Sequence, residues 1–187
     1  MKNLLVSVFV ILYAFIHLTN AVERNLLWKE FNGKSKSLSD VTQWRNNLKQ
    51  EVQNNLNKLP ESMKQELIER ADNETTSSWP SLMVMEFLEF VINGNRDHFE
   101  GHRADRRKKL VNLIIGELLT DKGKYMNHIA DGVWLILEES TWIWPAHLGL
   151  QKAGVGLPDP TQFIIDLGAG EASSHMAWIK LLMSNNT

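Results

Sequence analysis

Apolar residues recur at steps of three and four along most of the chain after residue 40, and this spacing constrains the fold more than any other feature. Such spacing gathers apolar side chains on one side of an α-helix, whereas a half-buried strand alternates at every second residue. No segment has a convincing strand pattern, and no repeat has a strict period. The sequence therefore predicts an all-α protein.

Short polar or glycine-containing turns divide this pattern into helical segments. The predicted helices cover about residues 40–59, 63–71, 81–92, 96–119, 125–139 and 166–183. Residues 73–80 are predicted to be a polar linker, and residues 151–165, which are rich in Gly and Pro, an ordered surface loop. The segment 81–92 is the most continuously apolar, so we expect a deeply buried helix there.

Helix, short turn and antiparallel helix in succession predict helical hairpins that pack side by side in a bundle or a ring. In an open ring the last helix would leave Ile179, Leu182 and Met183 without partners. Exposed apolar surface of that kind favours association between molecules. Self-association is therefore one expectation for this chain.

The first 21 residues have the three parts of a secretory signal peptide. Lys2 precedes an apolar run from Leu4 to Ile16, and Ala21 offers a small residue for cleavage. The run is too short to span a bilayer comfortably, although an uncleaved anchor remains the alternative. We expect a mature protein of residues 22–187 that is periplasmic or secreted and has no membrane association after processing.

The composition narrows the class of protein further. Removing 21 of the 187 residues leaves 166, which suits a single helical domain. The chain has no cysteine, so it cannot form disulfides, and this fits a bacterial periplasmic protein better than a small eukaryotic secreted one. A formal net charge of −2 argues against nucleic-acid binding through bulk electrostatics.

The segment 129–147 carries the residues that suggest a binding surface. Glu138 and Glu139 fall at the end of a helix, where the carbonyl groups disfavour negative charge. Trp142, Trp144 and His147 follow on a short irregular segment that contains Pro145. Carboxylates, indoles and an imidazole together are typical of a sugar-binding surface. The indoles could instead pack in the core or at an interface, and His147 could be a hydrogen-bonded structural residue.

A cluster of cations occupies the first half of the helix at 96–119. It consists of Arg96, Arg103, Arg106, Arg107, Lys108 and Lys109. Arginine pairs well with carboxylates, so this stripe could bind a uronic acid polymer, and Arg96 and Arg106 are better placed for this than the lysines. The alternative for the cluster is a solvated face with i,i+4 pairs between Arg96 and Glu100 and between Asp105 and Lys109. For Arg96 and Arg106, a further alternative is a buried charge that holds the helices together.

Two histidines on the same helix raise the question of a metal site. His98 and His102 are four residues apart, with Glu100 between them. No third ligand lies at a diagnostic spacing, and the order differs from the zinc-protease helix pattern. We therefore predict neither a metal nor another cofactor.

Several short motifs, taken in order, resemble the N-terminal part of heparinase II/III-like proteins over about residues 80–183. They are Asn93-Gly94-Asn95-Arg96, Phe99-Glu100, Arg106-Arg107, Glu117, Gly123-Lys124-Tyr125, Glu138-Glu139-Ser140-Thr141-Trp142, Pro145-Ala146-His147, Leu157-Pro158-Asp159, Asp166-Leu167 and Glu171. The resemblance implies an α/α toroid, followed in full-length relatives by a β-sandwich. It also implies a lyase that cleaves uronate-containing polysaccharides, such as heparin-like glycans or alginate. This chain would supply only part of that toroid.

The resemblance does not bring a complete catalytic set. Elimination needs a group that neutralises the carboxylate, a base and an acid. The family's catalytic tyrosine and histidine, as the resemblance implies them, belong to later segments, and Tyr125 lies in an apolar pattern typical of the core. What carries over is part of a substrate cleft for an acidic polysaccharide, formed by Glu138, Glu139, Trp142 and His147 with Arg96 and Arg106.

Three hypotheses follow from these residues. The first is an exported, truncated relative of a polysaccharide lyase that keeps part of its cleft. The second is a noncatalytic helical module that binds glycan or another protein. The third is the product of a broken gene with no role.

Overall fold

The computed structural model describes residues 41–162 and 165–183. The predicted signal peptide, residues 1–21, lies outside the described residues. Residues 47–187 form one compact unit, and it is this unit that is described below.

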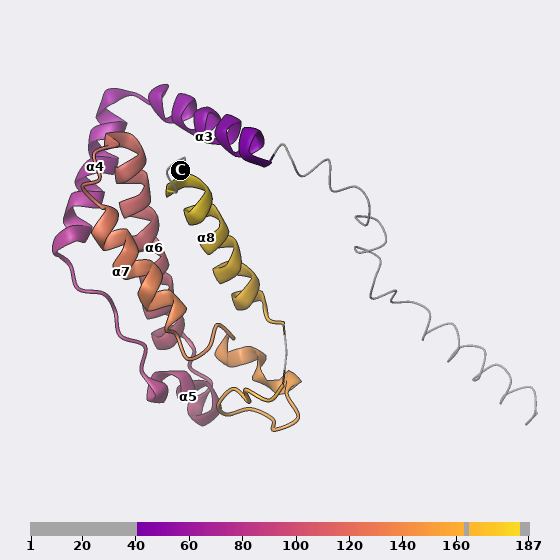
Figure 1. Ribbon diagram of the computed structural model, residues 1–187. Helices are drawn as coiled ribbons and strands as arrows, with labels where there is room; N and C mark the ends of the chain where they lie inside the picture. Colours follow the sequence, from indigo (N-terminus) through magenta and orange to yellow (C-terminus); the bar gives the residue numbers. More distant parts are fainter. Residues whose placement is uncertain (1–40, 163–164, 184–187) are drawn as a thin grey trace, which may run out of the picture. The chain divides into compact units, whose positions relative to one another are not determined.

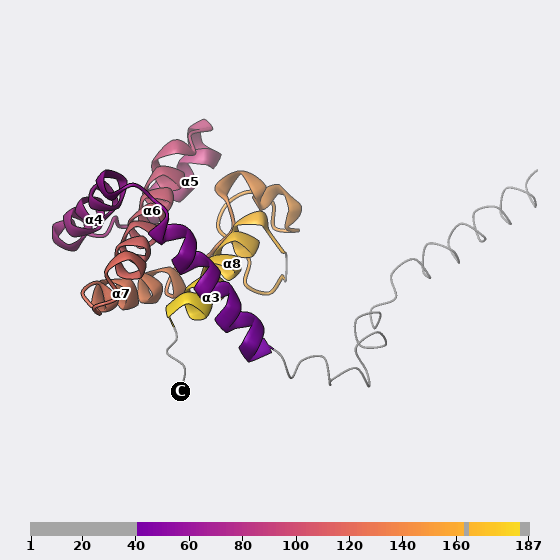
Figure 2. The same cartoon turned by 90° about the horizontal axis from the view of Figure 1, so that it is seen from above.

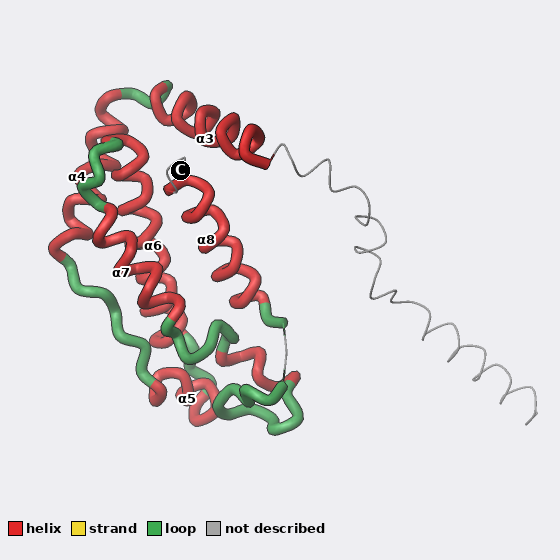
Figure 3. The backbone as a smooth tube through the Cα atoms, in the orientation of Figure 1, coloured by secondary structure: helices red, strands yellow, loops and turns green. Residues whose placement is uncertain are grey.

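Every regular element in the described residues is helical. The elements are α3 (Val41–Asn57), α4 (Glu61–Thr76), α5 (Val84–Asn93), α6 (Asp97–Thr120), α7 (Met126–Leu137), the 3-10 helix η2 (Pro145–Leu150) and α8 (Leu167–Met183). Helices joined by loops, without strands, make up the described part of the chain in Figure 1 and Figure 3. The all-α prediction is confirmed, whereas the α/α toroid stays a prediction.

Helix α6 is the element against which its neighbours pack. Its contacts with α4 join Glu74 to Asn112 and Ala71 to Gly116, so the two helices run in opposite directions. Helix α7 is also antiparallel to α6, because Arg107 near the start of α6 contacts Glu139 after the end of α7, whereas Glu117 near the end of α6 contacts Tyr125 before the start of α7. Figure 2 shows α4 and α7 beside α6 in the same unit. One predicted antiparallel hairpin, α6 with α7, is therefore present, whereas the antiparallel pair of α4 and α6 is formed across the intervening α5.

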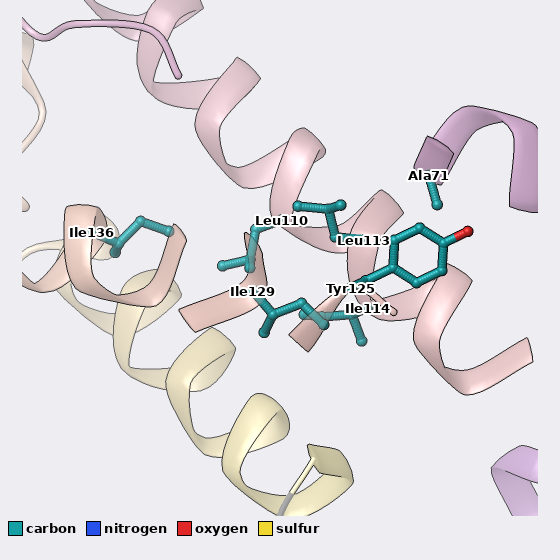
Figure 4. Close-up of a cluster of buried hydrophobic side chains, with 7 residues drawn as sticks. All are labelled: Ala71, Leu110, Leu113, Ile114, Tyr125, Ile129 and Ile136. Carbon is teal, nitrogen blue, oxygen red and sulfur yellow. The ribbon is translucent and has the colours of Figure 1, made fainter. Parts of the chain in front are cut away.

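The main hydrophobic core lies where α4, α6 and α7 meet. It consists of Ala71, Leu110, Leu113, Ile114, Tyr125, Ile129 and Ile136, which Figure 4 shows converging from these helices. Gly116 permits the close approach of α4, because a Cβ there would overlap the Ala71 side chain and lie 2.9 Å from Cε2 of Tyr125. Tyr125 has no exposed surface, which confirms its predicted place in the core.

A buried carboxylate shapes the turn between α6 and α7. Glu117 accepts hydrogen bonds from the backbone N–H of Gly123 at 2.6 Å and of Tyr125 at 2.9 Å. The negative charge lies at the start of α7, where the backbone dipoles favour it. The Tyr125 hydroxyl donates to Asp72 at 2.6 Å and so ties α7 to α4. Burial, and then this hydrogen bond, raise the pKa of Tyr125.

Helix α4 continues through Thr76, so the prediction of a polar linker from residue 73 is wrong. The physical reason is Lys109 of α6, whose ammonium group donates to the carbonyl oxygens of Glu74 at 2.7 Å and Ser77 at 2.5 Å. A cation at the carbonyl end of a helix stabilises that end. The predicted pairing of Lys109 with Asp105 is wrong for the same reason.

The burial of helix α5 also differs from the prediction. The helix ends at Gly94, whose φ of 81° gives the expected left-handed cap. We expected the helix to be deeply buried, but Phe87 is its one buried side chain. Phe87 packs edge to face on Phe99 of α6, with ring centroids 4.9 Å apart. Much of the apolar surface of α5 therefore faces outward.

The position of helix α8 differs from a third prediction. Met176, Ile179 and Met183 pack against the main core. Leu182 lies with residues of α6 in an apolar groove of about 250 Å³. The prediction that Ile179, Leu182 and Met183 lack partners is wrong, because α8 lies along α6 instead of at an open end.

The predicted surface loop after η2 is ordered around one buried amide. The side chain of Gln151 donates to the carbonyl oxygens of Gly154 at 2.7 Å and Leu157 at 2.9 Å. It also accepts a hydrogen bond from the backbone N–H of Asp159 at 2.9 Å. These three hydrogen bonds of one side chain fix the internal conformation of the loop.

Candidate functional site

The first half of α6 contributes three buried arginines to one network of charges. Arg103, Arg106 and Arg107 lie where α6 meets Glu139 after α7 and Glu171 on α8. The expected solvated face is therefore wrong at these positions, and the alternative of a buried charge that joins helices is confirmed for Arg106 but not for the exposed Arg96. Buried charges need partners, because the loss of water around them is costly.

The pair of Arg107 and Glu139 is the closest contact of this network. The two nitrogens Nη1 and Nη2 of Arg107 donate in parallel to the carboxylate of Glu139 at 3.0 and 2.8 Å. Only 1% of the Glu139 side chain is exposed. Two parallel hydrogen bonds fix both position and orientation. Glu139, expected to face a substrate, thus holds the end of α7 against α6.

Arg106 has two backbone partners and a more distant carboxylate. Its Nε donates to the carbonyl oxygen of Pro80 at 2.6 Å, and its Nη1 donates to that of Leu135 at 3.4 Å. Glu139 lies 3.6 Å away. Burial lowers the pKa of Arg106, while the charge of Glu139 opposes that shift. The guanidinium group stays charged at neutral pH, because the ordinary pKa of arginine lies far above neutral pH.

Arg103 lies between a tryptophan and the start of α8. Its guanidinium carbon is 4.2 Å from the centroid of the Trp144 ring, and its Nη2 donates to the carbonyl oxygen of Gly168 at 3.2 Å. Glu171 lies 3.4 Å from the same nitrogen. A Cβ on Gly168 would come within 2.8 Å of Arg103, so only glycine fits there. Trp144 is therefore a packing partner of a buried cation.

His147 is oriented by Asp166. The imidazole Nδ1 contacts the carboxylate of Asp166, which also accepts the backbone N–H groups of Gly168 at 2.8 Å and Trp144 at 3.3 Å. Asp166 thereby caps the first turn of α8. Burial would raise the pKa of Asp166, but the hydrogen bonds from Gly168, His147 and Trp144 outweigh it, and the pKa is lowered.

A cavity of about 240 Å³ lies beside this network, between α5, α6 and the segment after α7. Its polar lining comes from Arg106, Glu138, Glu139, Ser140 and Thr141. Its apolar lining comes from Leu82, Met83, Val84, Phe87, Phe99, Leu157 and Pro158. Polar groups on one side and apolar walls on the other are typical of a pocket for a small polar molecule.

The structure brings together three of the six residues expected to form a cleft. Glu138, Glu139 and Arg106 line the cavity, although the Glu139 side chain is almost fully buried by its ion pairs. Trp142 and His147 do not line it. The indole N–H of Trp142 donates to the carbonyl oxygen of Ile136 at 2.9 Å, which ties this segment back to α7. Arg96 also lies apart, in a surface pair with Glu100 at 2.8 Å, as the i,i+4 spacing predicted.

Sequence reasoning missed most of the cavity wall. Phe87 belongs to the apolar run at 81–92, and its contact with Phe99 depends on how α5 packs on α6. Ser140 and Thr141 belong to the motif at 138–142, but they were not expected to line a cleft. The partnership of His147 and Asp166 spans nineteen residues and has no local signal. The order of motifs that resembles the heparinase II/III-like proteins was the one available clue.

The two histidines of α6 face α5 instead of each other. His98 contacts Glu89 at 2.8 Å, and His102 contacts Glu86 at 3.1 Å. Within the described ranges, no group of three or more His, Asp or Glu side chains is placed to hold a metal ion.

None of the helices described is long and apolar enough to cross a membrane. A scan against protein-family models matched no family, and a search of curated proteins returned no match.

Proposed function

We propose that this chain is an exported glycan-binding protein related to the heparinase II/III-like lyases, and that it binds a uronate-containing saccharide without cleaving it. The observation that carries the proposal is the cavity lined by residues 138–141, which lie within the segment 129–147 that the sequence singled out for sugar binding. In this proposal the ligand is one sugar unit of an acidic polysaccharide.

The size of the cavity suits one sugar ring. A volume of about 240 Å³ equals roughly eight water-sized groups at ~30 Å³ each. One pyranose ring with some of its substituents fills such a space, and the rest of an oligosaccharide would extend into solvent. Binding would therefore be weak and limited to one unit.

The polar groups suit an acidic sugar. Arg106 is the one cation among the lining residues, and its Nη2 forms no hydrogen bond within the described residues. That nitrogen could donate to a uronate carboxylate. Glu138 and Ser140, both exposed at the rim, offer an acceptor and a hydroxyl for sugar hydroxyl groups.

The lining lacks the groups expected for elimination. It contains no tyrosine and no histidine. Tyr125 is fully buried in the core and donates to Asp72. His147 contacts Asp166 and lies outside the lining. We therefore propose binding without turnover.

Contacts between residues of different motifs support the proposed relationship to the lyases. Arg107 pairs with Glu139, Glu117 binds the N–H groups of Gly123 and Tyr125, and His147 contacts Asp166. The paired residues belong to different motifs of the resemblance and lie between six and thirty-two residues apart in sequence. Most of them hold helices and turns in place, so the shared pattern would reflect a shared scaffold.

Titration calorimetry with short heparin-like and alginate oligosaccharides tests the proposal. We expect weak binding by the purified chain and no growth in ultraviolet absorbance from an unsaturated uronate. Ser140→Trp should fill the cavity mouth and abolish the heat of binding. Ser174→Trp is the matched control, because Ser174 is an exposed serine on α8.

Two results would overturn the proposal in different ways. Steady release of unsaturated product would show a working lyase. Unchanged affinity in Ser140→Trp, or no heat with any acidic oligosaccharide, would exclude the cavity as a glycan site.

A further inference from the structure

Helix α5 is rotated so that its charged side faces the protein. Its two carboxylates, Glu86 and Glu89, contact His102 and His98 of α6 at 3.1 and 2.8 Å. An amphipathic helix on the surface of a monomer normally points its charges at water. The polar side of α5 is thus used to hold the helix on α6.

The opposite side of α5 is apolar and open to solvent. Five side chains of the helix and its first turn are each between 42% and 65% exposed: Met83, Val84, Met85, Val91 and Ile92. Single exposed apolar residues are ordinary, but a contiguous group of this kind marks an interaction surface.

This surface continues onto the end of η2, which contacts α5, and onto the loop that follows. Leu150 at the end of η2, and Val155 and Leu157 in the loop, are each more than half exposed. Leu157 lines the same cavity as Met83 and Val84, so the loop and the start of α5 are neighbours. In Figure 1 they lie at the same end of α6. We call these eight side chains the α5 patch.

The area of the α5 patch is close to what a stable dimer needs. An aliphatic side chain carries roughly 100 Å² of apolar surface, and these eight are on average more than half exposed. They offer about 450 Å² of apolar surface. Protein interfaces are about 57–65% apolar, so with its polar rim the patch approaches the ~800 Å² that each partner buries in a standard interface.

The charges around the α5 patch suit a second copy of the chain. Arg96 and Asp97 follow α5 in the chain, and Lys152 and Asp159 lie on the loop, so the segments that adjoin the α5 patch carry charges of both signs. Two copies could therefore meet without repulsion. A membrane-binding surface would instead carry a cationic rim, which the described residues do not form here.

We propose that the α5 patch is the interface of a symmetric homodimer, in which each copy covers the apolar side of the other copy's α5. A twofold axis makes the same patch serve both copies. Met83, Val84 and Leu157 also line the cavity, so association and cavity occupancy are linked. The dimer itself does not depend on the proposed glycan binding, and its test contains no ligand.

Sedimentation equilibrium of the purified full chain over a range of concentrations tests the dimer. Two valines make a matched pair, since Val91 in the patch and Val111 in the groove between α6 and α8 are both 42% exposed. Val91→Lys should raise the dimer dissociation constant at least tenfold, because it places two charges in the apolar interface. Val111→Lys should leave the constant unchanged. Circular dichroism of both variants checks that they fold.

Three results would contradict a homodimer formed through the α5 patch. A monomer at every concentration overturns the proposal. A dimer broken by Val111→Lys and kept by Val91→Lys places the interface in the groove. A monomer that floats with phosphatidylcholine vesicles, and loses that property in Val91→Lys, makes a lipid surface the occupant.

Discussion

The Glu139 carboxylate is almost fully buried, and it lies 2.8 Å from Arg107 and 3.6 Å from Arg106. Bringing these groups out of water costs several kcal/mol for each ion, and their attraction offsets this cost only while the geometry is kept. Such a pair as a whole contributes little to the free energy of unfolding. The loss of one member nevertheless leaves a buried charge without its partner. The network therefore specifies how α6, α7 and α8 meet.

Glu139→Gln should reduce the free energy of unfolding by about 3–5 kcal/mol, because it leaves two buried guanidinium groups without their carboxylate. Urea unfolding measures this loss. Glu66→Gln is the control, since its exposed pair with Arg70 should contribute no more than about 1 kcal/mol. Equal effects of the two substitutions would contradict the structural role of Glu139.

Asp166 links stability to pH. Its pKa is lowered in the folded protein, so it contributes stability above the unfolded aspartate pKa of about 3.9, and this contribution disappears as the pH falls through the lower folded value. Asp166→Asn keeps an oxygen that can cap α8 but removes the charge facing His147 and the nearby Arg103.

The difference in unfolding free energy between the wild type and Asp166→Asn should therefore be largest at neutral pH and shrink under acid conditions. Chemical unfolding at a series of pH values measures it, with Asp131→Asn, an exposed aspartate of α7, as the control. A difference that stays constant with pH would exclude the proposed linkage.

Helices α4 and α6 approach each other closely at Gly116. Gly116→Ala should lower stability by about 1–3 kcal/mol, because the new methyl group would overlap the Ala71 side chain in a packed core. Gly101→Ala on the same helix meets nothing within 4 Å. It should raise stability by about 0.5–1 kcal/mol through its effect on helix propensity. Thermal unfolding of both variants checks the prediction. Stability changes of the same sign in the two variants would contradict it.

Helix existence could be read from the sequence, but helix environment could not. The spacing of three and four predicted α6 within one residue at each end, and Gly94 correctly marked the end of α5. The same pattern misjudged burial in both directions. Apolar α5 lies at the surface, whereas Arg103 and Lys109 are buried. Local spacing reports which side of a helix is apolar; what covers that side depends on residues distant in sequence.

For the molecule as a whole, the six residues expected to form one cleft divide into separate groups. Glu138, Glu139 and Arg106 line the cavity, His147 contacts Asp166, and Arg96 stays at the surface. Their expected role in sugar binding stays a prediction. Their division could not be predicted, because it depends on long-range pairs such as Arg107 with Glu139.

Chemical-shift mapping by NMR during titration with an alginate or heparin-like oligosaccharide tests the proposed cavity most directly. We expect the largest amide shifts at the cavity residues Leu82, Ser140 and Thr141, with His128 of α7 unaffected. Shifts concentrated around Trp142 and His147, or no shifts at saturating oligosaccharide, would contradict binding in the cavity.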